Sequence, residues 1–76
     1  MKTEEFLKRV AEALEYDGEI TSNQDTLTID GWDSLGVLSI MELLSDLDVK
    51  YDVEKLGQIS NISELLETAS EILNRN

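Results

Sequence analysis

The 76-residue chain contains neither cysteine nor histidine, and this double absence is what most limits the folds open to it. A domain this small is stabilised by disulfides, by a structural metal or by very close packing of its helices. Disulfides are excluded here, and a structural zinc site would lack both of its usual ligands. The sequence therefore predicts one domain, residues 1–76, that relies on helix packing for its stability.

The same absence limits the chemistry that the chain can perform. It has no thiol nucleophile and no imidazole base, which excludes the usual catalytic triads and most metal-dependent hydrolase sites. Two carboxylates could in principle act as a glycosidase pair, but nothing marks out any two of them, and a bundle of this size has little room for a substrate cleft. We therefore expect a protein that is not an enzyme by itself.

Apolar residues recur at helical spacing in three parts of the chain. They predict main helices over residues 4–15, 34–47 and 62–75, and a short helix over residues 53–56. A long polar connection, residues 17–33, separates the first two main helices, and a loop of that length inside a small domain is often functional. The predicted fold class is all-α: a small bundle of three main helices plus one short helix, with a long loop between the first two.

Capping residues predict where these helices begin and end. Thr3 is expected to cap the first helix, and Gly18 to end it by adopting the left-handed conformation. Ser60 or Asn61 is expected to cap the last helix.

Three apolar residues are expected to anchor the long loop to the core: Ile20, Leu27 and Ile29. The alternation in TLTID, residues 26–30, suggests a short strand, but nothing else in the chain offers it a partner strand. We therefore assign no strand to the loop.

The acidic charge of the chain has two interpretations, an ordinary solvated surface or attraction to basic protein partners. Seventeen acidic residues against six Lys and Arg give a net charge of −11, which repels nucleic acid and anionic membrane surfaces and attracts basic protein surfaces. The first ten residues lack the apolar stretch of a signal peptide, and no apolar run approaches transmembrane length. We expect a monomeric cytoplasmic protein that binds neither nucleic acid nor membrane.

The segment IDGWDSLGVLSIMELL, residues 29–44, carries the main functional signal. Asp33 and Ser34 precede an apolar run, which is the usual pattern of a helix start. Calcium-loop and phosphate-loop patterns both fail here, because the closing acidic ligand of the first and the glycines and lysine of the second are missing. A serine at a helix start is exposed, and a group attached to Ser34 would project away from the bundle without disturbing its core.

The sequence DSLGVLSIMELL, which begins at Asp33, resembles the serine motif of acyl carrier proteins, in which Asp-Ser-Leu opens the second helix and the serine receives 4′-phosphopantetheine. Two later segments are similar to the same family. LDVKYD, from Leu47, stands where the family has Phe-Gly-Val-x-Ile, and ISNISELLE, from Ile59, resembles the start of the family's last helix. The resemblance covers nearly the whole chain and implies an acyl-carrier fold with 4′-phosphopantetheine attached to Ser34.

The resemblance also implies roles for the residues around Ser34. A phosphopantetheinyl transferase would move the arm from coenzyme A to the serine, with Asp33 and Leu35 orienting the loop or contacting the transferase. Acyl groups would then be bound to the thiol of the arm as thioesters. The partners would be acyl-activating, condensing or transferring enzymes with basic docking surfaces. The residues implied to contact partners are Trp32, Val37, Leu38, Met41 and Glu42. Packing against the core is the alternative for each of the apolar ones.

Three residues depart from the pattern of fatty-acid carriers: Trp32, Gly36 and Ser39 stand where that pattern has a small residue, an acidic residue and a glutamate. The departures imply a specialised stand-alone carrier that serves a fatty-acid, polyketide or related pathway. Two alternatives stay open. One is a peptidyl (aminoacyl) carrier, which shares the fold and the serine, and the other is an acidic helical adaptor that binds a partner without any prosthetic group.

Overall fold

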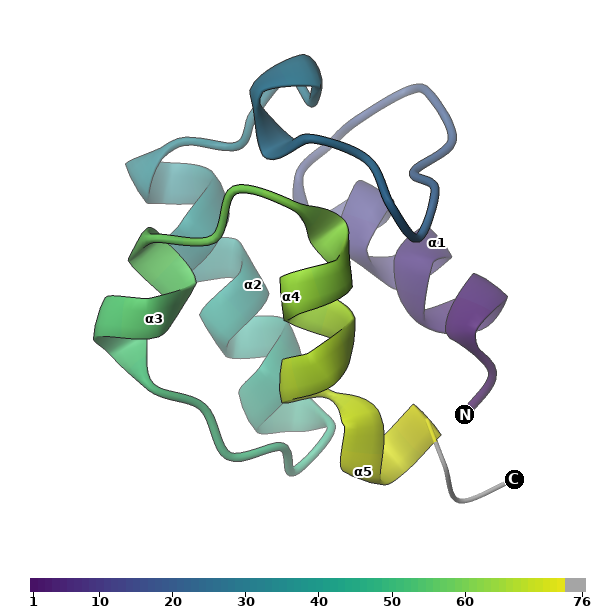
Figure 1. The fold of residues 1–76 in the computed structure, drawn as a ribbon, viewed down its shortest axis with the longest axis vertical. Coiled ribbons are helices and arrows are strands. Elements are labelled where there is room, and N and C mark those ends of the chain that lie inside the picture. Colours follow the sequence, from purple (N-terminus) through teal and green to yellow (C-terminus); the bar gives the residue numbers. More distant parts are fainter. Residues whose placement is uncertain (74–76) are drawn as a thin grey trace.

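The computed structural model describes residues 1–73, and over these residues the chain is helical and without strands (Figure 1). The elements in chain order are α1 (Thr3–Ala13), the 3₁₀ turn η1 (Thr26–Thr28), α2 (Ser34–Asp46), α3 (Val53–Gly57), α4 (Ile62–Thr68) and α5 (Ser70–Leu73). The predicted all-α class is therefore confirmed over the described residues. None of the helices in this part of the chain is long and apolar enough to cross a membrane.

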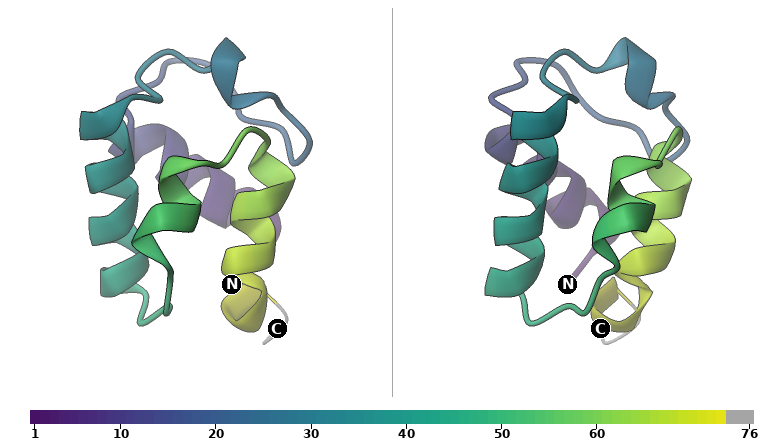
Figure 2. Two further views of the ribbon diagram at one scale, coloured as in Figure 1. Left: turned by 60° about the vertical axis from the view of Figure 1, so that its left-hand side comes forward. Right: turned by 90° about the vertical axis from the view of Figure 1, so that its left-hand side faces the viewer.

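The helices surround a single apolar core. Figure 2 shows α2 on one side, α3 and α4 on the other, and α1 crossing behind them. The connection between α1 and α2 runs over one end of the bundle, and this end, which holds η1 and the first turn of α2, is called the loop end below (Figures 1 and 2). The largest fully buried side chains come from all four of the longer elements: Phe6, Val10, Ile40, Leu44, Leu56, Ile62 and Leu65.

The first helix ends earlier than predicted, because its C-terminal cap does not use glycine. Glu15 takes the left-handed conformation, with φ of 56°, and the amides of Tyr16 and Glu15 bond back to the carbonyls of Ala11 and Glu12 at 2.9 and 3.1 Å. This pair of bonds is a Schellman motif, which satisfies the last carbonyls of the helix. The prediction that Gly18 ends the helix was wrong.

The predicted cap of the first helix was wrong, and the predicted cap of the last helix is confirmed. Thr3 lies inside α1, and the residue at the cap position is Lys2, whose side chain makes no capping bond. Asn61 caps α4 as predicted, and Glu64 completes a capping box by accepting from the Asn61 amide at 3.0 Å. The predicted last helix is interrupted at Ala69, which separates α4 from α5, and its expected end near residue 75 lies outside the described residues.

The long loop is fastened to the start of α4 by backbone and side-chain hydrogen bonds. The Thr26 amide donates to the Ser60 carbonyl at 3.1 Å, the Thr26 hydroxyl donates to the Ile59 carbonyl at 3.2 Å, and the Ile62 amide donates to the Gln24 carbonyl at 2.9 Å. The two backbone bonds form an isolated antiparallel bridge between Asp25 and Asn61, and the segment itself folds as a 3₁₀ turn in which the Thr28 amide donates to the Asp25 carbonyl at 3.0 Å. These bonds also fix which residues of the loop face the core.

Two of the three predicted loop anchors are confirmed. Ile20 and Ile29 are buried, but Leu27 is 93% exposed and the buried residue beside it is Thr26. Thr26 can be buried because its hydroxyl has a carbonyl partner, which removes most of the cost of taking a polar group out of water. The prediction that Leu27 is an anchor was wrong.

Candidate functional site

The start of α2 is built around the Asp33 side chain. Asp33 is the N-cap residue: its Oδ1 accepts from the Gly36 amide at 2.9 Å, and its carbonyl accepts from the Val37 amide at 2.8 Å. Capping by an aspartate satisfies one of the amides that a helix start leaves free. Ser34 is therefore the first residue of the helix and not its cap.

This division of roles leaves the Ser34 side chain free. Ser34 is exposed, and none of the hydrogen bonds found in the described part of the chain involves its hydroxyl. A serine at the cap position would turn its oxygen toward the amides of the first turn, but here Asp33 already occupies that place. The hydroxyl faces solvent beside amides of the first turn, which have no helical carbonyl before them and favour a nearby anion.

Two glycines hold the backbone on either side of Ser34. Gly31 has φ of +92°, a conformation that favours glycine, and a Cβ added to it would lie 2.9 Å from the Leu14 carbonyl oxygen. A Cβ added to Gly36 would overlap the Gly31 carbonyl oxygen and lie 2.8 Å from Cδ2 of Leu14. The loop, the end of α1 and the first turn of α2 thus meet at distances that admit no side chain at either position.

Four of the predicted site residues line one groove on the outer face of α2. The groove has a volume of about 590 Å³ and begins at Leu35, next to Ser34. Leu35 and Leu38 are 74% and 55% exposed, so the groove has an unusually apolar edge for a surface helix. Its lining is Leu35, Leu38, Ser39, Met41, Glu42, Ser45, Asp46 and Tyr51.

The remaining predicted contacts, Trp32 and Val37, lie elsewhere. Both are half-buried and pack against the core cluster, which is the alternative stated for them above. Tyr51 was not predicted to belong to the site, because it follows α2 by five residues and reaches the groove through the fold, where its hydroxyl lies 3.5 Å from that of Ser45. The signal for the glycine contact was present in the sequence as the spacing of Gly31 and Gly36 around Ser34.

The site lies in the most acidic part of the chain. From residue 10 to residue 49 the sequence has no Lys or Arg and ten acidic residues: Glu12, Glu15, Asp17, Glu19, Asp25, Asp30, Asp33, Glu42, Asp46 and Asp48. The only ion pair among residues 1–73 joins Arg9 to Glu5 within α1, at 3.9 Å. The field around Ser34 and the groove is therefore negative and favours a basic partner surface.

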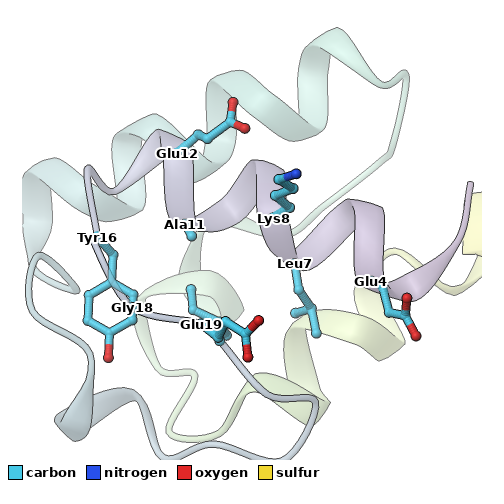
Figure 3. Close-up of a pocket in the computed structure, with 9 residues that line it drawn as sticks. Glu4, Leu7, Lys8, Ala11, Glu12, Tyr16, Gly18 and Glu19 are labelled. Carbon is cyan, nitrogen blue, oxygen red and sulfur yellow. The ribbon is translucent and has the colours of Figure 1, made fainter.

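A second groove, of about 600 Å³, lies between α1 and the segment that follows it (Figure 3). It is lined by Leu7, Ala11 and Ile20 with Tyr16 and Gly18 at one end, and by the charged side chains of Glu4, Lys8, Glu12 and Glu19. None of the predicted site residues lines it. No group of three or more acidic side chains in the described part of the chain is placed to hold a metal ion.

Comparison of the chain with protein-family models, with curated protein sequences and with solved structures found no match. The start of α2 combines an exposed hydroxyl that has no hydrogen bond in the described chain, a closely packed backbone on both sides of it, and an adjoining apolar groove with acidic borders.

Proposed function

We propose that the protein is a carrier to which 4′-phosphopantetheine is attached at Ser34, and that it presents acyl groups on this arm to partner enzymes of a fatty-acid, polyketide or related specialised pathway. The observation that carries the proposal is the Ser34 hydroxyl, which is exposed and makes no hydrogen bond within the described chain because Asp33 caps the helix in its place. The serine motif described above supports the same residue.

The attachment step requires only a hydroxyl from this chain. The Ser34 oxygen attacks the phosphorus of coenzyme A that bears the pantetheine, so that an O–P bond forms to Ser34 and the bond to the bridging oxygen of the pyrophosphate breaks. Adenosine 3′,5′-bisphosphate leaves, and the serine proton passes to a base of the transferase. The chain supplies the nucleophile and its position, and the transferase supplies the base and the cations that balance the phosphates.

The structure around Ser34 fits a tether point. Ser34 is exposed within the described residues, and the Gly31–Gly36 contact packs the backbone beside it without involving its side chain. When attached, the arm supplies the thiol that the chain itself lacks, and tethering raises the local concentration of the cargo at a docked enzyme. The α2 groove, with Leu35 and Leu38 exposed beside Glu42 and Asp46, suits a partner with apolar contacts and a basic border.

An acidic helical adaptor is the second candidate, and the same groove favours it. Exposed Leu35 and Leu38 are suited to bind a partner whether or not an arm is present. The two functions differ in their dependence on the hydroxyl: a carrier requires Ser34, whereas an adaptor that binds through the groove does not.

The deciding experiment is intact-mass measurement after incubation with coenzyme A, magnesium and a broad-specificity phosphopantetheinyl transferase. We expect wild type to gain one phosphopantetheinyl group and Ser34→Ala to gain none. Ser39→Ala is the matched control, because it removes a serine from the same helix, one whose hydroxyl donates to the Leu35 carbonyl at 3.3 Å, and it should be modified like wild type. Absence of a mass gain on wild type, or equal gains on wild type and Ser34→Ala, would refute the proposal.

A further inference from the structure

The exposed leucine of the long loop has no role in the fold. Leu27 is 93% exposed, more than any other large apolar side chain in the described chain, while its neighbours Thr26 and Ile29 are buried. A side chain that stays in water gains no burial free energy when the chain folds. In a 3₁₀ turn, residues three apart lie on one side, so Thr26 and Ile29 face inward and Leu27 is directed out.

The turn presents Leu27 on a fixed backbone. The Leu27 amide donates to Asp25 Oδ1 at 2.8 Å, and Thr26 is bonded through its amide and its hydroxyl to the carbonyls of Ser60 and Ile59. An apolar side chain on a backbone already ordered loses less freedom when it is buried by a partner. Leu27 is in this sense preorganised for an apolar contact with another molecule.

Leu27 belongs to an element that lies at the same end of the bundle as the start of α2, where Ser34 stands. The turn η1 and the first turn of α2 both lie at the loop end of the bundle, in every view of Figures 1 and 2. A standard interface covers about 800 Å² on each partner, and the molecule measures 29 × 25 × 19 Å. An interface of that size is wide enough, on a molecule of these dimensions, to cover both the first turn of α2 and the turn η1.

The charges around Leu27 define the partner surface. Asp25 and Asp30 flank the turn and Asp33 precedes Ser34, and the loop carries no basic residue. The complementary surface is an apolar socket bordered by Lys or Arg. The transferase must bring its active site to the Ser34 hydroxyl itself, whereas later enzymes act on a thiol at the far end of the arm. The transferase is therefore the partner that has to cover the loop end.

We propose that Leu27 is a docking contact for the phosphopantetheinyl transferase that modifies Ser34, and that it inserts into an apolar socket beside the transferase's active site. The inference rests on the proposed function. Leu27 does not touch the reacting atoms, so its contribution is to binding of the carrier and not to the transfer step. It therefore acts on the KM for the carrier and leaves kcat unchanged.

The test is a steady-state assay of the broad-specificity transferase with coenzyme A and the unmodified carrier as the varied substrate. Leu27→Ala is expected to raise the KM for the carrier about tenfold at unchanged kcat, since an apolar side chain of this size is lost from the interface. Val53→Ala is the matched control, because Val53 is also exposed, at 58%, but is the first residue of α3, a helix that begins at the end of the bundle opposite η1 (Figure 1). Circular dichroism should show all three proteins equally folded, as neither side chain is buried.

Leu27→Glu separates an apolar contact from general attraction between charges. If only the basic border of the transferase mattered, the added negative charge would lower KM; an apolar socket predicts that KM rises further than in Leu27→Ala. Binding of the transferase to the unreactive Ser34→Ala chain, with and without Leu27→Ala, should show the same loss in Kd. If wild type is modified, an unchanged KM for Leu27→Ala or a lower KM for Leu27→Glu overturns this inference but leaves the proposed function standing. If wild type is not modified, the proposed function is overturned and this inference with it.

Discussion

The close contact between Gly31 and Gly36 predicts that Gly36→Ala destabilises the protein, although alanine is the better helix former. Gly36 lies in the first turn of α2 and is buried. Its Cβ would overlap the Gly31 carbonyl oxygen, and would lie 3.0 Å from the Gly31 carbonyl carbon and 2.8 Å from Leu14 Cδ2. Leu14 can rotate away, but the Gly31 carbonyl is backbone, so the loop and α2 have to move apart.

The magnitude follows from two opposing effects. Overpacking a filled site costs about 1–3 kcal/mol, and a clash with backbone lies at the upper end of that range because no rotamer relieves it. Replacing glycine by alanine inside a helix contributes about 1 kcal/mol in the opposite direction. We expect a net loss of about 2 kcal/mol, which for a domain of this size lowers Tm by roughly 8–16 °C.

Gly57→Ala is the matched control, because a Cβ added to Gly57 would meet nothing within 4 Å. Gly57 ends α3, and its replacement is expected to stabilise the protein by about 0.5 kcal/mol through the same helix preference. Both variants are measured by urea unfolding followed by far-ultraviolet circular dichroism, with two-state behaviour checked by a second probe. A Gly36→Ala variant as stable as wild type, with Gly57→Ala stabilised, would refute the reasoning that the Gly31 contact requires glycine.

Three further predictions concern charges and caps. Backbone hydrogen bonds from Ser60 and Asn61 hold the pKa of Glu64 below its ordinary value of 4.5, so the contribution of the Glu64 carboxylate to stability is complete above that pH and is lost as pH falls through the lowered pKa. In urea unfolding, the free energy of unfolding that Glu64→Gln loses relative to wild type should therefore become smaller on acidification. A loss that does not change with pH would contradict this. Asp33→Ala should lower the free energy of unfolding by about 1 kcal/mol, because the helix cap is lost. Asp33→Asn keeps an oxygen that can accept from the Gly36 amide, so its loss should be smaller. Equal losses for the two variants in urea unfolding would show that the charge of Asp33, and not its capping bond, stabilises the helix. Because the net charge is −11, added sodium chloride should raise Tm by screening self-repulsion, and a Tm that does not change with salt would refute this.

The helices could be predicted from the sequence because the rules that set them are local. The apolar spacing of α1 and α2 involves residues within four positions of one another, and the capping box of Asn61 and Glu64 spans a single turn. The prediction of where α1 ends was wrong, because a second way of ending the helix was available a few residues earlier. Glu15 ended α1 by a Schellman motif before the chain reached Gly18, and a non-glycine residue in that conformation leaves no signal in the sequence.

The orientation of the loop could not be predicted, because distant residues determine it. Leu27 is exposed and Thr26 buried because the carbonyls of Ile59 and Ser60, more than thirty positions along the chain, accept from Thr26. Hydrophobicity alone predicts the reverse arrangement. Gly36 is a similar case: as a departure from a family pattern it looked like a lost acidic contact, and in the fold it is a position where no side chain fits.

The placement of Ser34 lets one short segment start a helix and also present the serine that we propose as the attachment point. A capping residue uses its side chain for the helix, and an attachment residue needs its side chain free, so one serine cannot satisfy both demands at once. Here the capping bond is made by Asp33 and the backbone is fixed by Gly31 and Gly36, on either side of the serine. The Ser34 hydroxyl is left exposed and without a hydrogen bond in the described chain, so the transferase that we propose modifies it need not order the loop first, and that ordering cost is removed from binding.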